Sequence, residues 1–307
     1  MYGFVICIPW FRKKKLGQIV RREGLKTHYC KNGTPTCGGI IFVISSTLIF
    51  IVYASILRYP PLYVIIILMP LVLYSIIGFI DDGLIIKEGK NDGLKANFKV
   101  LLEIIWASIY FYLYLKLNNN TIVKFFNYSL DLKFLYGVLV LLMFVSSTNS
   151  FNITDGVDGL SGGLMVICLI SVIILAGYKN NQALVLFSLI LLGSLLSYLC
   201  YNFGGAKIFM GDSGSLALGA TLANMFILLK MELLLIISGI VFIIETLSVI
   251  VQVIYFKLTK GKRIFLMSPI HHHFELKGLN EKKIDYLFWI IGFLAASLTV
   301  YLGIKYY

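Results

Sequence analysis

The sequence predicts an all-α protein, a polytopic bundle of transmembrane helices, and three observations lead to this fold class. Hydrophobic residues make up 59% of the 307 residues and charged residues only 14%, whereas soluble domains average about 45–50% apolar and about 25% charged residues. Uncharged stretches such as 183–198 and 233–244 recur along the chain. Several apolar segments reach the length of about 20 residues that a helix needs to cross the hydrocarbon core.

The hydrophobic segments divide the chain into nine expected spans. They lie at about 38–57, 62–80, 98–117, 134–151, 160–177, 182–201, 214–229, 233–256 and 285–304. Residues 1–11 are apolar but short for a crossing, so they form either a tenth, tilted span or an interfacial anchor. No hydrophilic stretch is long enough for a separate domain, and we therefore expect residues 1–307 to form one integral-membrane domain.

The distribution of basic residues predicts the orientation of the bundle. Of the 27 Lys and Arg residues, 20 lie in or at the borders of four loops, at 12–37, 81–97, 202–213 and 257–284. These loops alternate along the chain and so share one side, which the excess of positive charge makes cytoplasmic. The net charge of +12 is therefore expected at membrane edges and does not indicate a nucleic-acid site.

Two adjacent carboxylates, Asp81 and Asp82, end the 62–80 span on the predicted cytoplasmic side. Carboxylates at a membrane boundary are costly unless they are solvated, paired or bound to metal. Neighbouring helical residues point about 100° apart, which favours a division of labour, with one carboxylate near a metal and the other orienting or taking a proton. A solvated helix end is the alternative for an isolated pair.

A second polar cluster follows the 134–151 span on the same side. It holds the amides of Asn149 and Asn152 and the carboxylates of Asp155 and Asp158, which lie among glycines. On a helix start, residues three apart share a face, and glycines let a ligand approach the backbone. We expect these four side chains to bind substrate, although capping of the next helix could explain part of one Asp.

The third cluster comprises Asn202, Phe209, Gly211 and Asp212, and it precedes the 214–229 span. A glycine-rich turn that enters a helix N-terminus is suited to holding phosphate. Asp212 there suits Mg²⁺, which prefers one or two carboxylates together with phosphate oxygens. Phe209 could stack a nucleotide base. The alternative role for Asp212 is a simple helix cap.

Basic and imidazole side chains complete the candidate site. His271, His272 and His273 follow one another in the loop before the last span, and three consecutive residues cannot all reach one zinc ion from a helix. We therefore expect them to grip an anion such as phosphate. Lys31 and Lys99, in and beside two of the basic loops, are further candidates for substrate binding.

These clusters together resemble the polyprenyl-phosphate N-acetylhexosamine-1-phosphate transferase superfamily, and most closely its phospho-N-acetylmuramoyl-pentapeptide branch. The resemblance covers nearly the whole chain. It rests on five stretches in family order, at 33–39, 81–82, 152–160, 209–215 and 269–275. The Pro-Ile-His-His-His-Phe-Glu stretch at 269–275 favours this branch over those that use N-acetylglucosamine. Cys37 replaces a usual Met, and Ile85 replaces a usual Lys, which leaves open which loop lysine contacts the phosphates.

The resemblance implies a Mg²⁺-dependent transfer in a bacterial plasma membrane. Undecaprenyl phosphate would attack the sugar-proximal phosphate of UDP-N-acetylmuramoyl-pentapeptide and release UMP, with Asp81, Asp82, Asp212 and His271 as catalytic groups and Asp212 as the metal ligand. Membrane lipids are expected partners, and a homodimer is one expected assembly. The alternatives are a sister transferase that uses UDP-N-acetylglucosamine and, in a different class, a transporter. Polar clusters at one face, and not midway along the spans, argue against the transporter.

Overall fold

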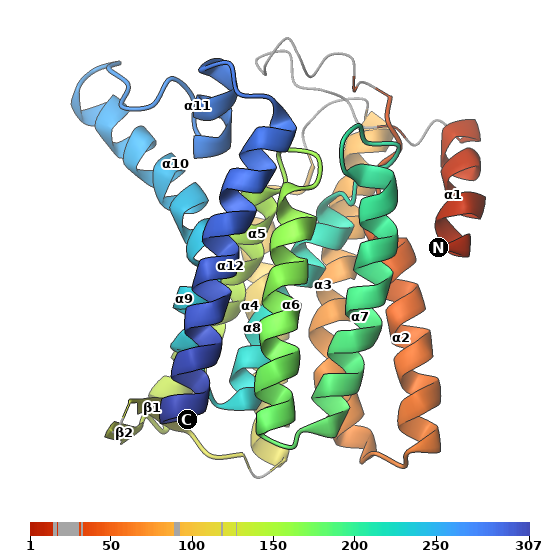
Figure 1. Ribbon diagram of the computed structural model, residues 1–307, viewed down its shortest axis with the longest axis vertical. Coiled ribbons are helices and arrows are strands. Elements are labelled where there is room, and N and C mark those ends of the chain that lie inside the picture. The colour runs from red at the N-terminus through yellow and green to blue at the C-terminus, as the bar shows by residue number, and fades with distance from the viewer. Residues whose placement is uncertain (15–16, 18–30, 32, 89–92, 118, 127) are drawn as a thin grey trace.

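A computed structural model describes the chain except for residues 15–16, 18–30, 32, 89–92, 118 and 127. Most of the helices run along the long axis of the molecule (Figure 1). The helices are α1 Tyr2–Lys13, α2 Gly39–Ile56, α3 Pro61–Glu88, α4 Ala96–Lys116, α5 Phe134–Thr154, α6 Leu160–Tyr178, α7 Gln182–Asn202, α8 Asp212–Leu229, α9 Leu234–Ser238, α10 Ile240–Leu258, α11 Ile270–Leu276 and α12 Glu281–Tyr306.

The expected membrane bundle is confirmed. Within the described residues, nine helices are long and apolar enough to cross a membrane. They match the nine predicted spans in number and order. Helix α1 has 12 residues, which at about 1.5 Å per residue is too short to cross a hydrocarbon core of about 30 Å without distortion.

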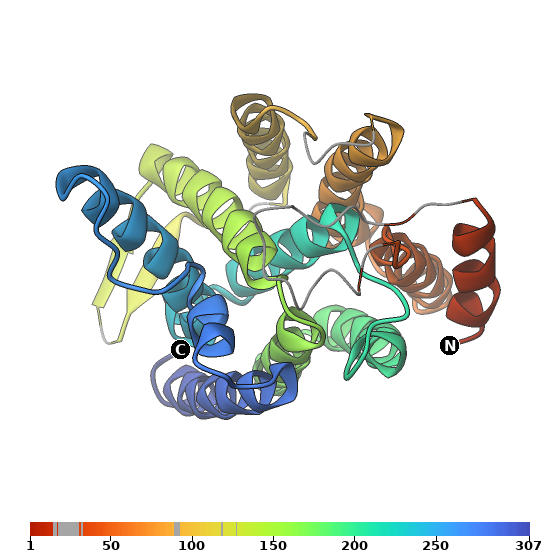
Figure 2. The ribbon, with the colours of Figure 1, turned by 90° about the horizontal axis from the view of Figure 1, so that it is seen from above.

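Helix α8 is the centre of the bundle. Of its membrane-crossing residues, 89% are buried inside the protein, and the view along the bundle shows it surrounded by the other helices (Figure 2). Its first two turns, Asp-Ser-Gly-Ser-Leu-Ala-Leu-Gly-Ala, are rich in small residues, which let neighbouring helix backbones approach closely. The central helix thus carries Asp212 at its first position, where the surrounding helices can reach it.

Three local features differ from the sequence expectation. Asp81 and Asp82 do not end their helix, because α3 continues to Glu88 and places the pair inside it. The expected 233–256 span is broken at Gly239 into the short α9 and the long α10. A small antiparallel hairpin, β1 Ile122–Phe125 and β2 Tyr128–Asp131, follows α4, with Val123 opposite Leu130.

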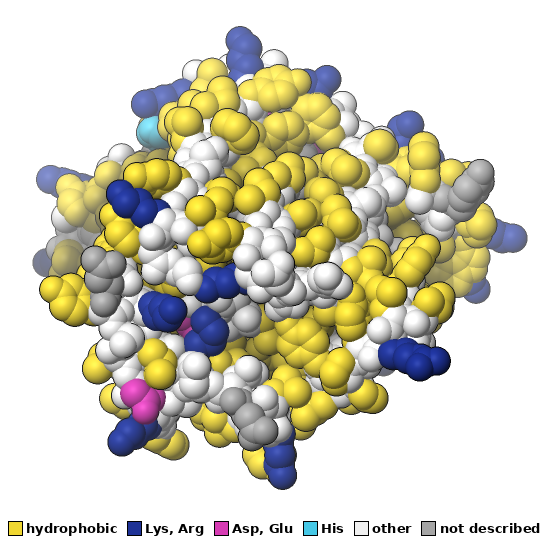
Figure 3. Space-filling view, turned by 60° about the horizontal axis from the view of Figure 1, so that its bottom comes forward, with side chains coloured by type: hydrophobic (Ala, Val, Ile, Leu, Met, Phe, Trp, Pro, Cys, Tyr) yellow, Lys and Arg dark blue, Asp and Glu magenta, His cyan; other side chains and the backbone are white. Residues whose placement is uncertain are grey.

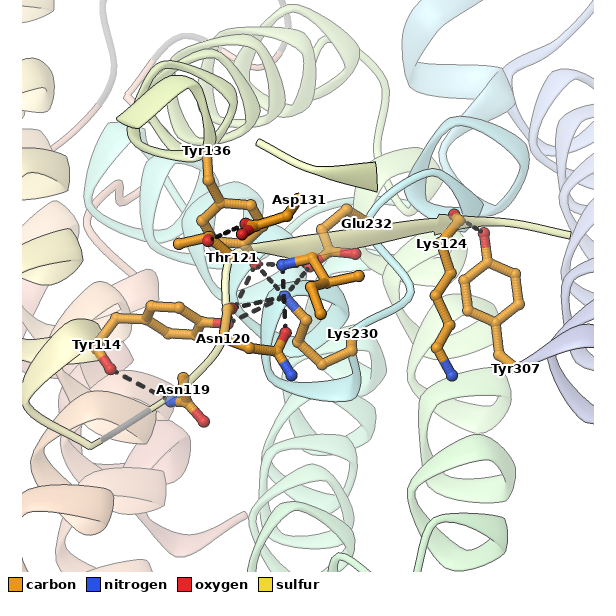
Figure 4. A network of polar contacts seen from close by, with 11 residues as sticks. Tyr114, Asn119, Asn120, Thr121, Lys124, Asp131, Tyr136, Lys230, Glu232 and Tyr307 are labelled. Carbon is orange, nitrogen blue, oxygen red and sulfur yellow. Dashed lines mark hydrogen bonds and ion pairs between the residues drawn. The ribbon is translucent and has the colours of Figure 1, made fainter. Parts of the chain in front are cut away.

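The end of the bundle near this hairpin, here called the far end, contains a polar network (Figure 4). The Lys230 ammonium donates to the hydroxyls of Tyr114 and Tyr136 and forms an ion pair of 3.0 Å with Glu232. The Tyr136 hydroxyl donates to the buried Glu232 carboxylate over 2.5 Å. Figure 3 brings this end forward and shows Lys and Arg side chains scattered among apolar ones. The network joins α4 and α5 to the turn that follows α8.

Candidate active site

The site lies at the end of the bundle opposite the hairpin, and its first component is Asp82. The Asp82 carboxylate is buried and accepts two backbone N–H groups from the start of α8, from Asp212 at 2.9 Å and from Ser213 at 3.1 Å. These amides have no partner within their own helix. Asp82 therefore accepts hydrogen bonds from two free backbone amides at the N-terminus of α8 and holds α3 against that helix.

Asp212 is held by side chains from two other helices. Its carboxylate forms an ion pair with the Lys99 ammonium of α4 and accepts a hydrogen bond of 2.7 Å from the Asn152 amide of α5. The same Asn152 amide donates to the Ser215 hydroxyl at 2.9 Å. Gly211, immediately before Asp212, has a φ of 69°, a conformation that glycine adopts without strain. These contacts orient the Asp212 carboxylate.

Asp81 lies beside Asp212, and their negative charges repel each other. One Asp81 oxygen accepts the Leu94 backbone N–H at 2.7 Å. The backbone at Gly93 is so close that a Cβ there would lie 2.7 Å from both Asp81 oxygens. Asp81, Asp82 and Asp212, here called the carboxylate cluster, thus gather three acids near Lys99.

The donors of the carboxylate cluster fit a Mg²⁺ that is completed by a substrate. No group of three or more His, Cys, Asp or Glu side chains in the described part of the chain has the arrangement of a protein-only metal cage. Mg²⁺ commonly uses one or two carboxylates plus waters and phosphate oxygens. Asp212 supplies one such carboxylate, held by the side chains of Lys99 and Asn152, whereas both Asp82 oxygens accept backbone amides at the start of α8.

A second acidic group occupies the turn between α5 and α6. Asp155 accepts a hydrogen bond of 2.5 Å from the Ser161 hydroxyl. Burial, reinforced by the negative charges of Asp212, Asp158 and Asp82, raises the pKa of Asp155 to about 8. The turn is not a helix start as expected, because α6 begins after Gly159, whose φ is 94°.

Asp158 faces Lys31 at the opposite side of this turn. The Lys31 ammonium donates to Asp158 over 2.8 Å and pairs with Glu281 of α12 at 2.7 Å, while the Ala206 backbone N–H donates to the second Asp158 oxygen at 2.9 Å. Burial disfavours the charge on Lys31, but the two carboxylates outweigh it and raise its pKa. Asp158 therefore joins three segments that are distant in sequence.

A pocket of about 550 Å³ opens at this junction. Its volume is in the range of small-molecule sites, about 300–1,000 Å³. It is lined by Lys31, Asp158, Gly204, Gly205, Glu275, Leu279, Asn280, Glu281 and Lys282. The lining combines two lysines, three carboxylates and two glycines that expose backbone, so it is suited to a polar ligand.

Asn202 and Phe209 lie on the segment that approaches α8. The Asn202 amide donates to the Ile208 carbonyl at 3.0 Å and its oxygen accepts the Gly159 N–H at 2.7 Å, so it holds the turn in place. The Phe209 backbone pairs with Pro35 and Gly38, and its side chain is not among those that line the pocket. Their assignment as nucleotide ligands stays a prediction.

The three histidines occupy the short α11 and have separate contacts. His271 is fully buried, and its Nδ1 lies 3.0 Å from Glu245 of α10. A Cβ at Gly156 would lie 2.5 Å from its Nε2, so the ring contacts the Asp155–Gly159 turn through the backbone. His272 Nδ1 lies 2.6 Å from Glu275, and His273 Nδ1 accepts the Leu266 N–H at 3.1 Å. The expected joint grip on one anion stays a prediction.

Comparison with known proteins is consistent with this geometry. A family model described as glycosyl transferase family 4 matches residues 64–230. The phospho-N-acetylmuramoyl-pentapeptide-transferase of Bacillus cytotoxicus is 42% identical over 97% of this chain and 92% of its own length. Its namesake in Staphylococcus carnosus is also 42% identical, over 97% of this chain and 94% of its own length. The chain belongs to the phospho-N-acetylmuramoyl-pentapeptide-transferase family.

The family match encloses the carboxylate cluster and most of its partners. Asp81, Asp82 and Asp212 lie between residues 64 and 230, as do Lys99 and Asn152. Lys31 and the histidines of α11 lie outside the family model. The alignments with the two relatives cover 97% of the chain.

Two glutamates of this family member were not anticipated from the sequence. Glu103 of α4 is buried and accepts a hydrogen bond of 2.8 Å from the Asn149 amide, so Asn149 faces Glu103 and not Asp212. Glu245 of α10 is buried against His271. Both acids stand inside apolar helices, and an ionisable residue within a span is itself a signal of function. That signal could have identified them.

Proposed function

We propose that this protein transfers phospho-N-acetylmuramoyl-pentapeptide from its UDP conjugate to undecaprenyl phosphate and releases UMP. The single observation that carries this proposal is the convergence of Asp81, Lys99 and Asn152 on Asp212 at one end of a membrane bundle. The family membership supports the same substrates. A soluble nucleotide and a lipid phosphate can meet at such an end without either one crossing the bilayer.

We place this end on the cytoplasmic side of a bacterial plasma membrane. The alternating basic loops support that orientation, because an excess of Lys and Arg marks cytoplasmic loops. A nucleotide-linked substrate made inside the cell would reach the pocket beside Lys31 and Asp158 directly. The assembly that we propose is a single integral-membrane domain, either alone or as a homodimer.

Asp212 is the residue that would hold Mg²⁺. Bound there, the ion would neutralise the charge on the donor diphosphate and polarise its phosphorus–oxygen bond. Lys99, which is already paired with Asp212, adds a positive charge near the position of the transferred phosphate. Asn152 fixes the Asp212 carboxylate. Positioning of two anionic reactants is the larger part of the catalytic task.

The proposed reaction is a single displacement. An oxygen of undecaprenyl phosphate forms a bond to the sugar-proximal phosphorus, and the bond from that phosphorus to the oxygen of UMP breaks, so that UMP leaves with the electron pair. Asp81 has one oxygen on the Leu94 amide, and the other is available to orient or deprotonate the lipid phosphate. A phosphate monoester has its second pKa near 6 and is mostly ionised at pH 7, so orientation matters more than proton removal.

Asp82 has a supporting role in this proposal. Both of its oxygens accept backbone amides, so neither is directed at a substrate. A covalent mechanism that used Asp82 as the nucleophile would have to break both hydrogen bonds and expose the N-terminus of α8. This arrangement favours direct attack by the lipid phosphate.

The substrate choice is tested with purified protein, undecaprenyl phosphate and Mg²⁺, and with UDP-N-acetylmuramoyl-pentapeptide or UDP-N-acetylglucosamine as the donor. We expect UMP release and a pentapeptide-bearing lipid with the first donor only. Efficient turnover of the N-acetylglucosamine donor, with none of the muramoyl donor, would assign the chain to a sister reaction. Movement of substrate across vesicles without UMP release would indicate a transporter.

A further inference from the structure

The C-terminal end of α10 carries a surface that the proposed reaction does not use. Residues 256–266, here called the return loop, comprise the end of α10 and the segment that folds back along it, with the Gly261 N–H donating to the Phe256 carbonyl at 2.9 Å. In Figure 1, α10 leans away from the bundle axis, and the return loop lies at the periphery of the molecule at the same end as α11. The top view also places it at the outer edge (Figure 2).

A buried glutamine gives the return loop a fixed shape. The Gln252 side chain accepts the backbone N–H groups of Ile264 and Phe265, both at 3.0 Å, and donates to the Phe265 carbonyl at 2.9 Å. Farther along, the Leu266 N–H donates to His273 Nδ1. The loop is therefore tied to α10 at one point and to α11 at another, so its outward side chains occupy defined positions.

The outward side chains of the return loop are of two kinds, basic and apolar. Lys257, Lys260, Lys262 and Arg263 are exposed, and the sequence contains no Asp or Glu between Glu245 and Glu275. Among the described residues, none of these four cations forms an ion pair. Beside them, Leu258, Ile264 and Leu266 are 78%, 47% and 50% exposed.

Basic and apolar side chains exposed together at the end of a membrane span favour contact with lipid. Single exposed apolar residues on a soluble surface are ordinary. Here they alternate with four cations that have no ion-pair partner among the described residues, and they lie at the end of a helix that is long and apolar enough to cross a membrane. Basic clusters beside a span attract anionic lipids, and apolar side chains with basic neighbours enter the boundary between headgroups and acyl chains.

We propose that the return loop is a docking surface for anionic phospholipid headgroups in the leaflet at the carboxylate-cluster end. The four cations bind headgroup phosphates, and Leu258, Ile264 and Leu266 enter the boundary beneath them. The occupant is bulk phospholipid and not the acceptor lipid, because cations spread over seven residues match several headgroups better than one phosphate. Through Leu266 and His273, the bound surface also steadies α11.

The test is photochemical cross-linking from within the loop. Ile264 is replaced by p-benzoylphenylalanine, and the protein is placed in nanodiscs of equal phosphatidylglycerol and phosphatidylcholine with identical acyl chains. We expect phospholipid adducts at position 264, with phosphatidylglycerol favoured roughly threefold or more. The triple change Lys260→Gln, Lys262→Gln and Arg263→Gln should reduce that preference to about one while adducts persist.

A matched control removes three positive charges elsewhere at the same end. Arg12, Lys13 and Lys14 are exposed at the end of α1, and changing all three to Gln should leave the preference at position 264 intact. The proposal is overturned if position 264 forms no phospholipid adducts, or if both triple variants behave alike. It is also overturned if one equivalent of undecaprenyl phosphate displaces the phosphatidylglycerol adducts, since the surface would then belong to the acceptor.

Discussion

At the scale of single residues, Asp212 takes part in most of the proposed chemistry. Its carboxylate pairs with Lys99 and accepts from Asn152, and it is the proposed Mg²⁺ ligand. We predict that Asp212→Asn lowers kcat by roughly 10²–10³-fold, the scale for losing one electrostatic group from a catalytic centre. The measurement is UMP release over a titration of Mg²⁺.

The control for Asp212 is an acid outside the site. Asp131 is exposed at the end of β2, where it accepts from Thr121 and the Lys133 amide. Asp131→Asn should retain wild-type turnover and the same Mg²⁺ dependence. Near-normal activity of Asp212→Asn at low Mg²⁺ would remove Asp212 from the metal site.

Asp155 gives a prediction about pH. Its folded-state pKa is raised to about 8 by burial and by neighbouring acids, while in the unfolded chain it is about 3.9. Between these values the folded protein holds a proton that the unfolded chain has released, so stability falls as pH rises from about 4 to about 8. Because Asp155 is only half-buried by exposed area, we expect a loss of about 1–3 kcal/mol and not the full shift.

Thermal unfolding in detergent without divalent ions measures this effect. Asp155→Asn cannot lose the proton, so its Tm should decline less than that of the wild type between pH 5 and pH 8.5. The hydroxyl of Ser161 can still donate to the amide oxygen, which keeps the local hydrogen bond. Parallel Tm profiles for the two proteins would show that Asp155 does not titrate in this window.

At the scale of helices, hydropathy was sufficient to predict the nine spans and their order, because each crossing requires a long apolar segment. The alternation of loops also predicted correctly that the segments bearing Asp82, Asn152 and Asp212 would meet at one end. The β1–β2 hairpin was missed, since strands of four residues give too weak a periodic signal.

The individual partners within the site could not be predicted. The two asparagines of the 149–152 cluster looked equivalent in sequence, but on α5 they point to different neighbours, Glu103 and Asp212. The histidines likewise diverge, because α11 turns each ring towards a different element. The neighbour that each side chain contacts depends on how its helix is rotated about its axis in the packed bundle. That rotation is set by contacts between distant segments.

The far-end network gives a prediction about stability. Tyr136 of α5 donates to the buried Glu232, which also pairs with Lys230 after α8 (Figure 4). Tyr136→Phe removes the hydroxyl and leaves the Glu232 carboxylate with one donor fewer, and we expect a loss of about 1–3 kcal/mol. Thermal unfolding in detergent should detect it, while turnover well below the Tm stays near wild type.

The matched control is Tyr112→Phe on α4. Tyr112 is 58% exposed, and its ring contacts Lys116, an interaction that phenylalanine can retain. This variant should unfold like the wild type. Equal Tm values for the two Tyr→Phe variants would show that the network does not stabilise the bundle.

At the scale of the whole molecule, the proposed orientation predicts opposite chemical accessibility for the two ends. In a cysteine-free background, a cysteine at Lys262, in the return loop, should resist a membrane-impermeant thiol reagent applied to intact cells. A cysteine at Ser129, which is exposed in β2, should react. Labelling at 262 from outside, with protection at 129, would invert the topology and separate the carboxylate cluster from a cytoplasmic nucleotide.

The most direct test of the proposed transferase is whether UMP release requires the lipid acceptor. Wild-type protein is mixed with Mg²⁺ and UDP-N-acetylmuramoyl-pentapeptide labelled in the sugar, first without and then with undecaprenyl phosphate. Direct attack by a lipid phosphate oriented by Asp81 predicts no UMP until the acceptor is added, and then one labelled lipid for each UMP. A stoichiometric burst of UMP before that addition, with the label trapped on the protein, would contradict it.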